Sequence, residues 1–125
     1  MIEGGCLCGA IRYRIEDGEH PAANCHCTLC RRASGAPFVS WLVVPEAAFA
    51  FTRGEPRLLR STPGGRRWFC ADCGTPLGCV TETHPGVVDV TIGSLDEPER
   101  FPPQVAVFLD TALPWANREV PEWKG

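Results

Sequence analysis

RRWFCADCGTPLGCVT, residues 66–81, carries the clearest structural signal in this chain. Strand-like residues lead into the cysteine pair C-A-D-C at 70–73 and out of it again, which predicts a β-hairpin with two thiols at its turn. Gly74 follows the second cysteine and can adopt a left-handed backbone conformation, so that backbone N–H groups point at the sulfurs. The stretch therefore predicts a metal-binding hairpin.

A second cysteine pair, in C-L-C-G at residues 6–9, is likewise followed directly by a glycine. Together the two pairs offer four thiolates, from Cys6, Cys8, Cys70 and Cys73. Four thiolates close a tetrahedral site and leave no exchangeable position, which is typical of structural zinc. Such a site would tie the N-terminal segment to the hairpin, and metal binding would then contribute directly to folding.

The third cysteine group lies in CHCTLCRR, residues 25–32, and supplies only Cys25, Cys27 and Cys30. His26 stands between two of these residues, so its side chain is expected to point away from a metal that they share. Cys79 lies on an expected strand, where a free cysteine is more often a small buried hydrophobe. By elimination, the second site has three thiolates and one open position, which is the arrangement of a catalytic zinc.

Other interpretations of the cysteines remain. The triplet could be a redox-sensitive thiol cluster, or it could close with Cys79 as the fourth ligand. His20 and His84 occupy turn-like contexts and are expected at the surface. A framework of disulfides among the eight cysteines is disfavoured, because the start of the chain does not resemble a signal peptide and disulfides belong mainly to oxidising compartments.

Length and charge narrow the class of protein. The 125 residues predict a single zinc-binding domain over 1–125, and the composition is that of a globular protein. The net charge of -3 argues against nucleic-acid binding, and no apolar run is long enough for a membrane span. A cytoplasmic location is expected. The sequence does not indicate whether the protein is a monomer or an oligomer.

Periodicity predicts a mainly β fold with few helical turns. Beyond the hairpin, strands are expected at 11–15, 38–44, 49–52, 57–61, 87–93 and 105–109. A short helix is expected at 27–35, with single turns at 45–49 and 94–97. The last fifteen or so residues are predicted to be a polar tail.

Four blocks of the sequence resemble the glutathione-dependent formaldehyde-activating enzyme family, which includes the centromere protein V domain. They are GGCLCGAIRY, CHCTLCRRASGAPF, FCADCGTPL and VVDVTIGSLDEPERFPP, and the likeness runs from about residue 4 to about residue 115. The resemblance implies a small, mainly β zinc-binding fold of short coiled antiparallel sheets with few helical turns, and two Zn²⁺ per chain. It also implies structural zinc ligands at Cys6, Cys8, Cys70 and Cys73, and catalytic zinc ligands at Cys25, Cys27 and Cys30.

The activity that the resemblance implies is that of a carbon–sulfur lyase, S-(hydroxymethyl)glutathione synthase, which joins glutathione to formaldehyde. The expected partner is then a small thiol such as glutathione. Its two carboxylates call for basic residues, for which Arg31 and Arg32 are the first candidates and Arg66 and Arg67 weaker ones. Many family members have a histidine where this chain has Ala106, which bears on the choice of thiol or carbonyl substrate.

Two other functions compete with this one. A non-catalytic zinc-binding module would use the same cysteines and bind a partner protein. A zinc hydrolase would need a general base beside the metal, and no H-E-x-x-H motif is present. Glu46, Asp72 and Asp89 are acids without an assigned position, and surface charges are the simpler interpretation.

Overall fold

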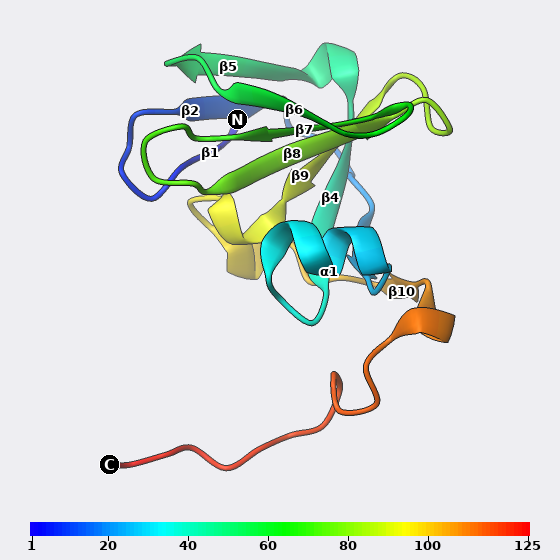
Figure 1. Ribbon diagram of the computed structural model, residues 1–125. Helices are drawn as coiled ribbons and strands as arrows, with labels where there is room; N and C mark the ends of the chain where they lie inside the picture. The colour runs from blue at the N-terminus through cyan, green and yellow to red at the C-terminus, as the bar shows by residue number, and fades with distance from the viewer.

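The computed structural model describes residues 1–125 and contains ten β-strands in two sheets (Figure 1). The smaller sheet is antiparallel, in the order β1 (Ile2–Gly5), β2 (Arg12–Ile15) and β5 (Phe49–Arg53). The larger sheet has the order β10 (Val105–Val107), β3 (Ala22–Cys25), β4 (Val39–Pro45), β9 (Val87–Thr91), β8 (Pro76–Thr81), β7 (Gly65–Phe69) and β6 (Arg57–Thr62). The mainly β prediction is confirmed.

One strand pair departs from the antiparallel expectation, because β10 runs parallel to β3. Parallel neighbours need a long connection, and the chain provides one. Between β3 and β10 this connection contains α1 (Thr28–Ser34) and strands β4 to β9, and its last part passes through the 3₁₀ turns η2 (Ile92–Ser94) and η3 (Pro98–Arg100) and several prolines before it reaches the edge of the sheet. The single turn expected at 94–97 does not form. Instead, η2 ends at Ser94, η3 begins at Pro98, and Leu95 between them forms an isolated β-bridge with Gly4.

The only α-helix, α1 (Thr28–Ser34), lies within the segment 27–35 where a helix was expected. It begins at Cys27, whose sulfur accepts a hydrogen bond from the Cys30 N–H at 3.2 Å. It ends at Gly35, whose φ of 73° is the left-handed conformation that commonly closes helices. The expected turn at 45–49 is also present, as η1 (Glu46–Ala48), and the chain has a further turn, η4 (Leu109–Thr111).

The core lies between the two sheets. Successive side chains of β4 and β9 point to opposite faces of the sheet. Leu42, Val44, Val88 and Val90 therefore point inward and are fully buried. Tyr13 covers them from the smaller sheet, with its hydroxyl 2.7 Å from the Ser94 hydroxyl. The residues that alternate with these core positions form the opposite face of the larger sheet, here called the outer face.

Removing the side chain of Leu42 tests this core. Leu42 is 0% exposed, so Leu42→Ala is expected to lower the free energy of unfolding by about 3 kcal/mol through lost burial and an unfilled cavity. Leu59→Ala is the matched control, because Leu59 is 53% exposed and its loss should cost well under 1 kcal/mol. Urea unfolding followed by circular dichroism measures both, and equal destabilisation would contradict this core.

The end of the chain differs from the two sheets. After η4 the backbone forms no further strand or helix, as expected, and it runs away from the sheets in Figure 1. Several large apolar residues are exposed from β10 to the C-terminus: Val105, Phe108, Leu109, Trp115, Val120 and Trp123. No helix in the structure has the length and apolar character that crossing a membrane requires.

Candidate metal centres

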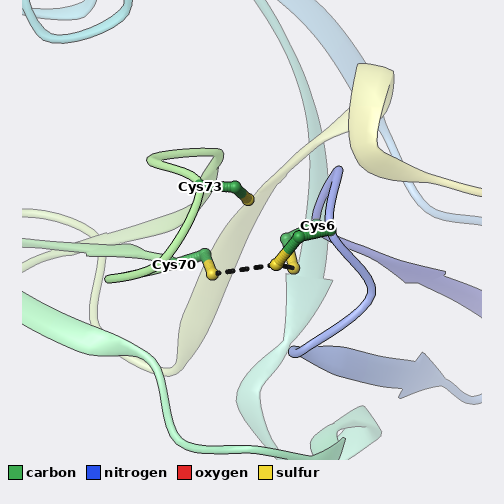
Figure 2. A group of neighbouring side chains, drawn as sticks. Cys6, Cys70 and Cys73 are labelled. Carbon is green, nitrogen blue, oxygen red and sulfur yellow. Dashed lines mark hydrogen bonds between the residues drawn. The ribbon is translucent and has the colours of Figure 1, made fainter.

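Four cysteine sulfurs, from Cys6, Cys8, Cys70 and Cys73, lie within 4.8 Å of one another. The Cys6–Cys8 and Cys8–Cys70 sulfur distances are 3.7 Å and 3.8 Å. A disulfide needs about 2.05 Å between its sulfurs, whereas thiolates about 2.3 Å from a tetrahedral zinc lie about 3.8 Å apart. Figure 2 shows Cys70 and Cys73 on one turn, with Cys6 facing them from the N-terminal loop.

Local backbone geometry creates this arrangement. Gly9 and Gly74 have φ angles of 80° and 81°, the left-handed conformation that the sequence predicted after each cysteine pair. The first turn brings the Ile11 N–H to 3.3 Å from the Cys6 sulfur, where it offsets thiolate charge. These glycines therefore shape the turns that present the sulfurs, and a Cβ at either position would strain the backbone.

Thr75 links the two turns and was not recognised from the sequence. Its hydroxyl accepts a hydrogen bond from the Leu7 N–H at 3.1 Å and lies 3.2 Å from the Cys73 sulfur. With the Leu7 N–H as donor, the Thr75 hydroxyl is free to donate to Cys73. The Thr75 hydroxyl and its backbone N–H lower the pKa of the Cys73 thiol to about 5, which favours the thiolate that a metal needs.

The second cluster combines the end of β3 with the start of α1. Cys25 ends the strand, Cys27 caps the helix, Cys30 lies in its first turn, and the three sulfurs are within 4.8 Å of one another. Cys25 and Cys30 are buried and Cys27 is partly exposed. Hydrogen bonding from Cys25 lowers the pKa of the Cys30 thiol to about 5, and Arg67 acts in the same direction.

His26 takes no part in this sulfur cluster. Its ring is 1% exposed and packs against Phe38 with ring centroids 4.8 Å apart, as expected for a side chain that points away from its neighbours' sulfurs. Its backbone fixes the C-terminal segment, because its N–H donates to the Val107 carbonyl and its carbonyl accepts from the Thr111 hydroxyl. The segment 105–111 therefore borders the second cluster.

Cys79 lies beside the second cluster, on the outer face of β8. It is 5% exposed and packs with Cys25, Cys30 and Trp41, but its sulfur is not among the three that lie within 4.8 Å. Burial raises the pKa of the Cys79 thiol to about 11. A protonated thiol of this kind packs as a small apolar group, which agrees with the expectation from the sequence.

Among the candidate arginines, only Arg67 contacts a sulfur. It lies on β7 directly opposite Cys79, and its Nη2 donates to the Cys30 sulfur at 3.7 Å. Arg66 projects from the other face of β7, on the side of Trp68. Arg31 is partly buried in the turn of α1 that follows Cys27, and Arg32 is exposed.

The remaining polar residues fall into two groups. His84 is exposed and His20 is partly exposed with its ring 2.9 Å from the Glu16 carbonyl, so neither belongs to a sulfur cluster. Asp89 pairs with Cys79 across β8 and β9 and is half-buried, and burial raises the pKa of its carboxyl. Ala106 pairs with Asn24, one residue before Cys25, and is exposed.

The donor sets fit zinc at both positions. Soft thiolates in tetrahedral sets of four, or in threes beside an open position, are the ligands that zinc and iron–sulfur centres use. In the four-sulfur cluster the 3.7 Å and 3.8 Å sulfur separations agree with the zinc value, in the second cluster the three sulfurs lie within 4.8 Å of one another, and all eight cysteines are free rather than joined as disulfides. Both clusters could therefore hold a metal ion, and zinc suits their geometry.

Known proteins are similar to this chain in sequence and in fold. A protein of Halomonas elongata, provisionally named a glutathione-dependent formaldehyde-activating enzyme, is 25% identical over 95% of this chain and 82% of its own. An uncharacterized lyase of Schizosaccharomyces pombe is 31% identical over 60% of this chain and 54% of its own. A crystal structure of a Rhodobacter sphaeroides protein, 24% identical, has the same fold, with a TM-score of 0.68 over 83% of this chain and 98% of that one.

A family model also matches most of the chain. The model described as glutathione-dependent formaldehyde-activating enzyme matches residues 1–111, a span that includes both cysteine clusters, α1 and all ten strands. The chain therefore belongs to the glutathione-dependent formaldehyde-activating enzyme family.

Proposed function

We propose that this protein is a zinc-dependent enzyme of the carbon–sulfur lyase kind, which acts on glutathione or a related thiol and a small aldehyde. One observation supports the proposal above all: the chain has a cluster of four sulfurs and a separate cluster of three. In the proposal, Cys6, Cys8, Cys70 and Cys73 hold a structural zinc. Cys25, Cys27 and Cys30 hold a second zinc that has room for one external ligand.

The reaction in the synthetic direction forms one bond and moves one proton. The sulfur of the thiol bonds to the aldehyde carbon, the C=O double bond becomes a single bond, and the thiol proton ends on the new hydroxyl oxygen. A zinc in the second cluster would supply an open position and lower the pKa of a thiol that enters it. Holding the sulfur in a fixed place also favours the addition by orientation.

The protein residues around the second cluster fit this task. Cys25 and Cys30 are buried between α1 and the outer face, whereas Cys27 is partly exposed and marks the side open to a substrate. In the proposal, Arg31 and Arg32 bind the substrate carboxylates. Arg31 is the better placed of the two, because it follows Cys27 by one helical turn and so lies on the same side of α1.

Binding of the thiol can be observed directly in protein whose zinc has been replaced by cobalt. Glutathione added to this sample is expected to change the visible absorption of one cobalt site only, because the four-sulfur site has no position for a further ligand. S-methylglutathione is the control, since its sulfur carries no ionisable proton. An unchanged spectrum at millimolar glutathione would contradict the proposal and favour the non-catalytic zinc-binding module.

A further inference from the structure

Arg67 is a half-buried cation, and Asp89, which lies on the same face of the sheet, forms no salt bridge with it. No carboxylate lies within ion-pair distance of its guanidinium, and its Nε is buried without a hydrogen-bond partner. Its one side-chain hydrogen bond runs from Nη2 to the Cys30 sulfur at 3.7 Å. Because burying a charge without compensation is costly, an arginine in this place calls for a negative group at the second cluster.

Strand register fixes Arg67 in this position. Arg67 pairs with Cys79 on β8, and Cys79 pairs with Asp89 on β9, so these three side chains share the outer face. Cys79 in turn packs against Cys25 and Cys30. The guanidinium therefore reaches the Cys30 sulfur along the outer face of the sheet.

Charge balance distinguishes the two clusters. A divalent ion with four thiolates carries a net charge of -2, and with three thiolates -1, so an external thiolate would add one negative charge to the second cluster. The four-sulfur cluster has fixed dipoles around it, including the Ile11 N–H and the Thr75 hydroxyl, and no arginine contact. In the second cluster the Cys30 N–H donates to the Cys27 sulfur, and the cationic guanidinium of Arg67 donates to the Cys30 sulfur.

We propose that Arg67 is a positioning residue that sets the affinity of the second cluster for an external thiolate. Its guanidinium holds the Cys30 sulfur and offsets the charge that the fourth sulfur adds. This inference rests on the proposed function and assigns Arg67 to the sulfur of the substrate, in contrast to Arg31 and Arg32, which are proposed to bind its carboxylates. A thiol without any carboxylate should therefore depend on Arg67 as strongly as glutathione does.

The test uses cobalt-substituted protein titrated with glutathione and with 2-mercaptoethanol, which has no carboxylate. Arg67→Met is expected to raise the dissociation constants of both thiols at least tenfold, with two cobalt ions retained per chain. Arg67→Lys keeps the charge but loses the planar fork, so an intermediate effect is expected. Arg66→Met, on the other face of the same strand, is the matched control and should match the wild type.

Four results would overturn the inference. Weaker binding of glutathione alone would assign Arg67 to a carboxylate. Unchanged binding of both thiols would remove its role while leaving the proposed function intact. Loss of the second cobalt from both Arg67 variants would show that the cluster itself needs the arginine. A wild-type protein that binds neither thiol would overturn the proposed function together with this inference.

Discussion

Replacing Cys70 with serine is expected to leave the protein largely unfolded and poorly soluble. Cys70 is 1% exposed and belongs to the four-sulfur cluster that joins the N-terminal segment to the β7–β8 hairpin. The apparent free energy of binding a structural zinc is about 10–16 kcal/mol, as large as the whole stability of a typical domain, about 5–15 kcal/mol. Loss of one sulfur from such a site would remove much of what holds the two segments together.

Soluble yield, zinc content and thermal unfolding followed by circular dichroism measure this effect. Cys79→Ser is the matched control, because Cys79 is similarly buried, lies on the next strand and stands outside both ligand sets. It should remain folded with two zinc ions and lose only about 1–3 kcal/mol for a buried hydroxyl. A Cys70→Ser protein that melts like the wild type and retains two zinc ions would contradict the structural role.

The cysteine clusters could be predicted because sulfur ligands are few and their spacing is local. Cys70 and Cys73 share one turn, and a glycine after each pair was enough to predict the left-handed backbone found at Gly9 and Gly74. Periodicity likewise predicted a strand at 87–93, where β9 lies with Val88 and Val90 buried together. These features depend on residues a few positions apart, so the sequence itself contains the information.

Two strands could not be predicted, because their pairing comes from tertiary context. Strand β3 has the sequence AANC, in which neither alanine nor asparagine favours strands, yet it lies between β4 and β10. Strand β1 contains Gly4, where a Cβ would lie 2.4 Å from the Tyr13 hydroxyl oxygen, so only glycine fits. Such requirements are visible only when the neighbouring strand is in place.

The ranking of the arginines also depended on long-range register. The sequence favoured Arg31 and Arg32 because they directly follow the cysteine triplet, but only Arg67 contacts a sulfur. Arg66 and Arg67 are adjacent and look alike in the sequence, and the faces they occupy follow from the pairing of β7 with β8. A bulge after Trp68 shifts that register, and no local pattern reveals where a bulge lies.

Replacing Cys27 with serine should have a different outcome from Cys70→Ser: a folded protein with one zinc instead of two and no turnover above the uncatalysed rate. The Cys27 sulfur has two tasks, since it belongs to the three-sulfur cluster and accepts the Cys30 N–H at the start of α1. Serine is among the preferred residues at a helix N-terminus, so its hydroxyl can take over the second task. A neutral hydroxyl is a poor substitute for a thiolate, so the first task is lost.

Comparison with Cys27→Ala separates these two tasks. Both variants should bind one zinc and fail to bind glutathione, because each lacks the third thiolate. Cys27→Ala should also unfold more easily than Cys27→Ser, by about 1 kcal/mol, since only the alanine variant leaves the Cys30 N–H without a cap. Metal analysis, thiol titration and thermal unfolding of the two proteins measure these effects. If Cys27→Ser instead loses both zinc ions and unfolds as Cys70→Ser does, the two clusters form one structural unit, and the division between a structural and a reactive site is wrong.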